Sequence, residues 1–306
     1  MAAHPVPPLT FDTTFDPQTG VPVPVAPGVL RLTAPNSGPF TFKGTNTFIL
    51  GTERVAVVDP GPSSDVHLKA ILDTVDKRPV EAIILTHTHR DHSDLVERLQ
   101  AAVDAPLWFG VRHRPSRKRR LFEVDWVRRD SDYDLVPDRT LADGEHIDVA
   151  GIGLEVIATP GHCSNHLCFG LAGTETMLSG DHVMGWSTTM VAVPDGSMGA
   201  YLGSLRKVVA LPYRAYLPAH GGTIADGPRY ARQLLAHREM RNEQIVRAVQ
   251  GGARNSAQLL AAVYPKLAAN LLPAARMTLG AHVEYLSDSG RLRLRRGLFG
   301  AVIEPA

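Results

Sequence analysis

The sequence has little cysteine, few aromatic residues and almost no net charge. Of its 306 residues only Cys163 and Cys168 are cysteines, aromatic residues make up 6%, and the formal net charge at pH 7 is +1. Two cysteines five positions apart make no disulfide framework and match no zinc knuckle. We interpret them as small buried residues of a protein in a reducing compartment. A charge near zero gives no overall attraction to nucleic acid or to a membrane.

Long apolar runs are also missing. No run approaches the ~18–20 residues that span a bilayer, and residues 1–8 have neither the basic nor the apolar region of a secretory signal. Hydrophobic content of 44% and charged content of 21% are ordinary for a soluble globular protein. We therefore expect a cytoplasmic protein with no membrane partner, and the sequence selects no oligomeric state.

Histidine, by contrast, is concentrated. Three of the 13 histidines fall in the segment Thr86-His87-Thr88-His89-Arg90-Asp91-His92, directly after the apolar run 81–85, which predicts a short buried strand. A polar turn is the alternative, but three histidines within six residues are improbable by composition, and imidazole and carboxylate suit zinc and related ions. Where the chain is still extended, side chains two apart point the same way, so His87 and His89 can chelate one ion. Asp91 and His92 follow where the chain turns and can face a second ion. A structural zinc site would close with four ligands, usually including cysteine, so the pattern indicates a catalytic site.

Around this motif the chain resembles the metallo-β-lactamase superfamily, whose signature is HxHxDH after a central strand. Four further segments follow the order of that family: Val57-Val58-Asp59-Pro60-Gly61, Thr159-Pro160-Gly161-His162, Ser179-Gly180-Asp181 and Pro218-Ala219-His220-Gly221. The resemblance implies two divalent ions, zinc first and manganese or iron as alternatives. It assigns His87, His89 and His162 to the first ion, Asp91, His92 and His220 to the second, and Asp181 to a position between them.

The resemblance also implies supporting roles and a chemistry. Asp59, His166 and His182 are expected to hydrogen-bond to the ligands or to line the substrate cleft. Two ions about 3.5–4 Å apart generate a bridging hydroxide, which Asp91 would help to orient. The true β-lactamases of one major subclass carry a cysteine where this chain has Asp181, so we expect the broader hydrolase branch.

Short apolar runs alternate with turns and helical patterns, which by themselves indicate α/β or α+β. Strands are expected at 28–33, 46–51, 55–59 and 81–85, and helices at 67–75 and 93–102, the latter capped by Ser93. The resemblance narrows this to α+β: an αββα sandwich of two mixed sheets with helices outside. We expect an extended N-terminal arm (1–27), a catalytic domain (28–228) and a C-terminal domain (229–306).

A polar insertion interrupts the catalytic domain at about 111–146. It opens with six basic residues in the nine positions 112–120. Arg117, Lys118, Arg119 and Arg120 are possible phosphate-binding residues, because a dense basic run attracts phosphates. The alternative is a solvated loop whose charge is offset by the acidic residues that follow it.

The C-terminal region predicts helices at 229–250, 257–264 and 272–286, followed by a basic and apolar strand at 291–296. This is the order of a winged helix-turn-helix. The third helix carries only Arg276 among arginines and lysines, so we expect a packing module and no sequence-specific DNA binding. Segments 44–48, 180–187 and 237–245 make the chain similar to the β-lactamase-like protein 2 group within the superfamily.

Three functions are compatible with these patterns. The first is a dinuclear metal-dependent hydrolase that uses a metal-bridging hydroxide on a phosphodiester, such as the single-stranded RNA cleaved by an animal mitochondrial member of the group, or on a small ester. The second is a glyoxalase II-like thioester hydrolase acting on hydroxyacylglutathione. The third is a non-enzymatic nucleic-acid-binding protein with structural metals. The complete set of seven ligands favours a hydrolase, but substrate does not follow from the scaffold.

Overall fold

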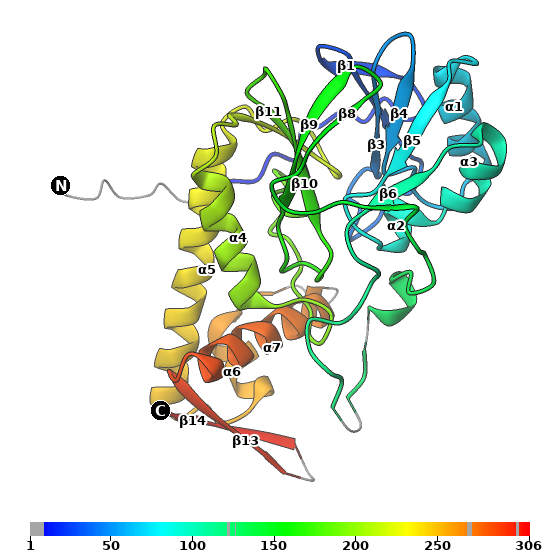
Figure 1. Ribbon diagram of the computed structural model, residues 1–306. Helices are drawn as coiled ribbons and strands as arrows, with labels where there is room; N and C mark the ends of the chain where they lie inside the picture. Colours follow the sequence, from blue (N-terminus) through cyan, green and yellow to red (C-terminus); the bar gives the residue numbers. More distant parts are fainter. Residues whose placement is uncertain (1–8, 121–122, 126, 268–270, 298–299) are drawn as a thin grey trace.

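Two β-sheets lie face to face, and helices cover the outer face of each (Figure 1). The computed structural model describes residues 9–120, 123–125, 127–267, 271–297 and 300–306. The first sheet has the strand order β1 to β7 and the second the order β12-β11-β10-β9-β8. The strands of the first sheet are β1 (Val23–Ala26), β2 (Val29–Thr33), β3 (Asn46–Leu50), β4 (Val55–Val58), β5 (Val80–Ile84), β6 (Leu107–Phe109) and β7 (Arg139–Thr140). Those of the second are β8 (His146–Val149), β9 (Ile152–Ala158), β10 (Leu167–Leu171), β11 (Thr176–Gly180) and β12 (Ala215–Pro218).

The strands are apolar on both faces because both faces are covered. In β3, Phe48 and Leu50 point into the core between the sheets, while Ile49 points outward beneath the helices. Phe169 and Leu171 of β10 meet them from the second sheet. Successive side chains point to opposite faces of each strand. One set therefore fills the core between the sheets, and the other set packs beneath the helices.

Helices α1 (Asp65–Val75) and α3 (Val96–Val103) pack on the outer face of the first sheet, and α4 (Met198–Val209) and α5 (Gly227–Gln250) cover the second (Figure 1). α4 begins at Ser197, whose hydroxyl accepts from the backbone N–H of Ala200. The α+β sandwich predicted from the sequence is confirmed in this arrangement. No helix in the described part of the chain is long and apolar enough to cross a bilayer.

The C-terminal elements form a small core of their own. α5 continues past the second sheet and packs with α6 (Ser256–Val263) and α7 (Leu272–Asp288), and the hairpin β13 (Leu292–Gly297) and β14 (Gly300–Pro305) closes the unit (Figure 1). The order of helices and hairpin is the expected one. Its assignment as a winged-helix domain, and the domain boundaries at 28 and 229, stay predictions.

Two expected element boundaries differ from the structure. The last part of the expected N-terminal arm is strand β1, which pairs antiparallel with β2. The helix expected from Ser93 is split: α2 (Arg90–Ser93) is a single turn, and α3 starts at Val96. Ser93 caps nothing, because its hydroxyl donates to the backbone carbonyl of His89. The chain stays extended to His89 and turns from Arg90, which brings Asp91 and His92 back over the strand end.

Strand direction places the polar loops at one edge of the sandwich. β11 and β12 are parallel, so the segments that follow them emerge at the same edge, and β5 is parallel to β4 in the other sheet. Asn46 of the first sheet donates through its side-chain amide to the carbonyl of Pro218, at the end of β12 in the second sheet, and to that of Gly221 in the loop that follows. The two sheets are therefore held in register at the edge where the histidines collect.

Candidate metal centre

Four loops bring seven polar side chains to this edge. The loops follow β5, β9, β11 and β12. His87 and His89 come from the first loop and His162 from the second. Nδ1 of His89 lies 3.1 Å from Nε2 of His87 and 2.8 Å from Nε2 of His162, so the three nitrogens form one group that could hold a metal ion.

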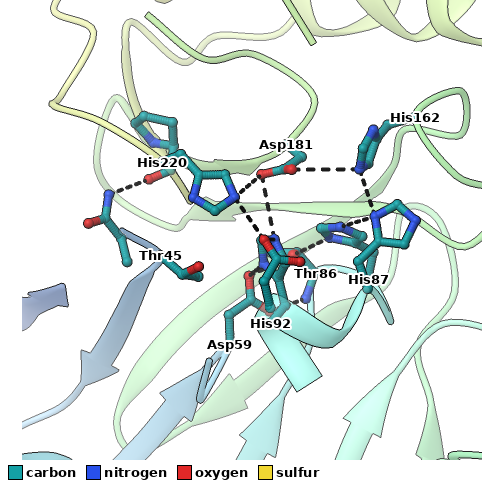
Figure 2. A network of polar contacts seen from close by, with 12 residues as sticks. Thr45, Asp59, Thr86, His87, His92, His162, Asp181 and His220 are labelled. Carbon is teal, nitrogen blue, oxygen red and sulfur yellow. Dashed lines mark hydrogen bonds and ion pairs between the residues drawn. The ribbon is translucent and has the colours of Figure 1, made fainter. Parts of the chain in front are cut away.

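A second group lies beside the first. Nε2 of His220 is 3.3 Å from Oδ2 of Asp91, and Nε2 of His92 is 3.5 Å from the same oxygen. Asp181 lies between the groups, and Figure 2 shows it with His162 on one side and His220 and His92 on the other. Its Oδ2 is 3.6 Å from Nε2 of His162, and its Oδ1 is 3.4 Å from Nε2 of His220. One carboxylate thus presents one oxygen to each group.

Every histidine in the two groups uses its other ring nitrogen as a donor. Nδ1 of His162 donates to the carbonyl of Met190 at 2.7 Å, and Nδ1 of His220 to that of Gly44 at 3.3 Å. The remaining donor pairs run from His87 to the Thr86 hydroxyl, from His92 to Asp59 and from His89 to Asp195. A neutral imidazole that donates from one nitrogen carries a lone pair on the other. In the neutral state of the rings, the five nitrogens that face the centre are therefore bare acceptors.

Bare acceptors that face one another need a cation between them. Nε2 of His92, Nε2 of His220 and Oδ1 of Asp181 are buried and have no hydrogen-bond partner. Leaving such groups unpaired costs about 1–3 kcal/mol each. A tetrahedral zinc site with bonds of 2.0–2.1 Å has ligand atoms about 3.3 Å apart, close to the separations seen in both groups. The donor set therefore fits a divalent metal ion in each group.

The charged groups of the centre also favour the binding of cations. In the described part of the chain, the ion-pair partners of Asp59, Asp91, Asp181 and Asp195 are all histidines. Burial lowers the pKa of His162 to about 4, and the neighbouring His89 lowers it as well. Burial also lowers the pKa of His92, but the carboxylates of Asp91 and Asp181 outweigh it and raise the value to about 9. The second group thus attracts positive charge, whether protons or metal.

The three expected supporting residues lie around the centre. Asp59 accepts from the backbone and hydroxyl of Thr86 at 2.8 and 2.7 Å and from Nδ1 of His92 at 3.0 Å (Figure 2). His166 accepts from the backbone N–H of Asp181 at 3.0 Å and contacts the hydroxyl of Thr159 at 2.8 Å. The buried ring of His182 packs edge-on against Tyr201, behind the centre. Three sets of side chains among the described residues could hold a metal ion, the third being His87, His92 and Asp181, which overlaps the two groups above, and Asp59, His166 and His182 belong to none of them.

Sequence reasoning missed Asp195 and His113. Asp195 accepts from Nε2 of His89 at 3.0 Å and from Nε2 of His113 at 2.7 Å, and both new residues are buried. In the sequence, Asp195 stands in Pro194-Asp195-Gly196, which is typical of a turn, and His113 stands inside the basic run. The only available signal was the general requirement that each ligand histidine has a hydrogen-bond acceptor, and that requirement does not say where the acceptor lies.

The four possible phosphate-binding residues separate into two kinds. Arg117 contacts Glu123 at 2.5 Å and Glu284 of α7 at 2.8 Å, and Arg120 also pairs with Glu284. Lys118 and Arg119 are exposed, and neither has an ion pair in the described part of the chain. Two of the four residues, Arg117 and Arg120, therefore join the insertion to the C-terminal helices, and a phosphate-binding role for Lys118 and Arg119 stays a prediction.

An αββα sandwich with a histidine and aspartate cluster at one edge defines the class of metallo-β-lactamase-fold proteins. The model of the metallo-beta-lactamase superfamily matches residues 40–220, more than half of the chain. The chain belongs to the metallo-beta-lactamase superfamily. At this level the prediction of an enzyme from a hydrolase family is confirmed.

Fungal and animal proteins are similar to this chain. An atrochrysone carboxyl ACP thioesterase of Aspergillus fumigatus is 30% identical over 81% of the chain and 76% of its own length. A lactamase-like protein of Emericella nidulans is 29% identical over 71% of the chain, which spans 64% of that relative. A beta-lactamase-like protein 2 homolog of Caenorhabditis elegans is 27% identical over 72% of the chain and 71% of its own length.

Solved structures extend the likeness beyond the sandwich. A metallo-beta-lactamase family protein from Thermus thermophilus is 25% identical, with a TM-score of 0.74 over 92% of this chain and 99% of that one. A beta-lactamase domain protein from Burkholderia ambifaria, 23% identical, has a TM-score of 0.79 over 96% of both chains. The fold of these proteins is shared over most of the chain.

Proposed function

We propose that this chain is a dinuclear metal-dependent hydrolase of carboxylic thioesters or esters. The observation that carries the proposal is the Asp181 carboxylate, which presents one oxygen to His162 and the other to His220 and His92. A side chain shared in this way couples two cation sites. His87, His89 and His162 would hold the first ion, and Asp91, His92 and His220 the second, with zinc as the first choice of metal and manganese or iron as alternatives.

Two divalent ions at this position supply an activated water and stabilise the charge that develops on an attacked carbonyl. Around the two ions, the side chains of the protein orient the reacting groups and hold protons. Asp91 is the most exposed carboxylate of the centre, with 30% of its side chain accessible against 9% for Asp181. It therefore faces the side from which a substrate arrives, and it can accept the proton that an attacking water must lose. Asp59 and Asp195 are buried and hold ligand histidines instead.

Thioesters are favoured as the substrate class for two reasons. Three of the similar fungal proteins are named as atrochrysone carboxyl ACP thioesterases. In addition, Arg117 and Arg120 are engaged by Glu123 and Glu284, which removes two of the four possible phosphate-binding residues. In the reaction, water oxygen bonds to the thioester carbonyl carbon, the carbon–sulfur bond breaks, and the products are a carboxylate, a thiol and one proton.

Phosphodiester cleavage is the second candidate, because Lys118 and Arg119 remain exposed on the insertion. It predicts that Lys118→Gln with Arg119→Gln reduces RNA cleavage in a salt-dependent way. The same double variant should leave turnover of an uncharged acyl thioester unchanged.

A substrate panel tests the proposal. Purified protein of known metal content would be assayed with an acyl-pantetheine thioester, S-lactoylglutathione, a lactone, single-stranded RNA and a β-lactam. We expect thioester turnover that falls by about a thousandfold or more in Asp91→Asn, because the second metal ion would lose a charged ligand and the attacking water its proton acceptor. Asp94→Asn, a change of the same kind three residues away in a carboxylate paired with Arg90, is the matched control and should keep wild-type turnover. Cleavage of RNA alone would overturn the substrate class, and protein that takes up no divalent metal would overturn the mechanism.

A further inference from the structure

Asp195 connects two buried histidines, one of them beside the candidate metal centre. Its Oδ2 is 3.0 Å from Nε2 of His89, and its Oδ1 is 2.7 Å from Nε2 of His113. Asp195 is 1% exposed, His113 5% and His89 7%. The three side chains come from three different loops, so this line of contacts exists only in the folded chain.

Hydrogen bonding fixes the direction of the contacts. The carboxylate of Asp195 can only accept, so Nε2 of both histidines donates. The Thr88 hydroxyl accepts from the side-chain amide of Asn165 at 2.9 Å and contacts Nδ1 of His113 at 3.0 Å. His113 is thereby held at both nitrogens, with its Nε2 proton directed at Asp195. His89 is left with its lone pair on Nδ1, the nitrogen that faces His87 and His162.

We propose that Asp195 is a positioning residue that holds the metal ligand His89, and that His113 in turn holds Asp195. The inference rests on the metal centre of the proposed function. Two of the five ligand histidines donate to a carboxylate: His92 to Asp59, which belongs to the family segments, and His89 to Asp195, which lies outside them. A carboxylate on the far nitrogen orients the ring and raises the basicity of the nitrogen that binds metal.

The insertion is what holds Asp195 in place. The backbone carbonyl of Asp195 accepts from the backbone N–H of Ser116 at 3.0 Å and from its hydroxyl at 2.6 Å. The next residue, Arg117, reaches Glu284 on α7. Contacts therefore run from the C-terminal helices through the insertion to a ligand of the first ion, and the insertion supports metal binding in addition to any role at the surface.

Metal affinity tests the inference directly. Stepwise titration with zinc against a competing chelator gives two dissociation constants for the wild-type protein. Asp195→Ala should weaken one of them 10–100-fold and leave the other within about twofold, since removal of such a partner has an effect of this size. Asp195→Asn keeps the volume and one acceptor, so we expect a smaller loss, and His113→Phe a smaller loss again. Asp59→Asn is the comparison variant: it removes the carboxylate behind His92 and should weaken the constant that Asp195→Ala leaves unchanged, while its contact with Thr86, whose hydroxyl contacts His87, also reaches the first group.

A spectroscopic readout separates positioning from general stability. With cobalt(II) as the probe metal, the ring N–H of His89 gives an exchangeable, paramagnetically shifted proton signal. This proton should exchange slowly in the wild-type protein and rapidly in Asp195→Ala, while the signal of His92 is unchanged. If both constants and the slow exchange stay at wild-type values in Asp195→Ala and Asp195→Asn, the inference is wrong. The proposed thioester hydrolysis can fail in its own assay without changing this result, because no substrate is present here.

Discussion

Nε2 of His166 accepts a hydrogen bond from the backbone N–H of Asp181 at 3.0 Å, and its ring contacts the hydroxyl of Thr159 through Nδ1. His166 therefore has no lone pair left for a metal ion, although it lies four residues after His162 and its ring centroid is 5.0 Å from that of His87. Its role is to orient the chain at the carboxylate that lies between the two groups.

These hydrogen bonds predict that substitution of His166 and substitution of His162 have different effects on metal binding. After dialysis against trace zinc, His166→Ala should still bind two ions per chain, with affinity reduced about tenfold because Asp181 is less well oriented. His162→Ala should bind one ion, because it removes a nitrogen that belongs to the first group. Elemental analysis of both dialysed proteins checks the pair. Loss of a whole ion in His166→Ala would contradict the assignment.

Gly161, which precedes His162, leaves no room for a side chain. Gly161 has φ +146°, and a Cβ placed there would lie 2.3 Å from the Cα of Tyr201, so alanine requires a backbone shift. Gly161→Ala should lower the free energy of unfolding by about 3 kcal/mol or more, measured by urea denaturation. Gly203→Ala is the control, since it lies inside α4 with open space around the new Cβ. It should be neutral or more stable by up to about 1 kcal/mol.

The contact between the insertion and α7 predicts a measurable coupling. Arg117 and Glu284 are 23% and 15% exposed at the side chain and meet through two hydrogen bonds of 2.8 Å. A double-mutant cycle with Arg117→Gln and Glu284→Gln should give a coupling energy of about 1–3 kcal/mol. The exposed pair Lys69 and Asp73 should give about 0.3–0.5 kcal/mol in the same experiment. Equal values for the two pairs would show that the insertion is not held by this contact.

The same arginine predicts a pH dependence of stability. The hydrogen bond from Arg117 lowers the pKa of Glu123 to about 2, below its ordinary value of 4.5. A carboxyl group whose pKa is lower in the folded state stabilises the fold above the unfolded pKa and loses that contribution as pH falls toward the folded pKa. The difference in stability between wild type and Arg117→Gln should therefore be full above about pH 5 and shrink between about pH 4.5 and 2. Chemical denaturation of both proteins across this range measures the difference, to which Glu284 contributes in the same direction because Arg117, acting against burial, also lowers the pKa of that carboxyl group. A difference that is constant across the range would exclude a shifted Glu123.

Much of the fold follows from local patterns in the sequence. Strands with apolar residues at every position, such as 55–58, require cover on both faces, and the helical patterns beside them supply it. The α2 turn was missed, because the sequence offers Ser93 as a helix cap while tertiary contacts bend the chain three residues earlier. The strand at 23–26 was missed because prolines flank and interrupt it, and only pairing with β2 makes it a strand.

The candidate site, like the fold, was predicted from the sequence only where local patterns encode it. Short-range motifs named the seven side chains that meet at the sheet edge, since a motif records which residues sit at the ends of strands. The partners behind them were recovered only where they too sit in a motif, as Asp59 does. Asp195 and His113 lie 82 positions apart and meet through two loops. Their pairing depends on how an insertion folds back over the edge, and no periodicity or spacing in the chain encodes that.

The candidate ligand set spans residues 87 to 220 and draws on loops from both sheets. Chain synthesis must therefore pass His220, and the two halves of the sandwich must close, before any complete chelate exists. A metal ion can then bind to all of its ligands only after the chain has folded. Removal of the metal with a chelator should therefore leave the hydrophobic cores between and outside the sheets folded. A zinc finger, by contrast, unfolds when it loses its ion.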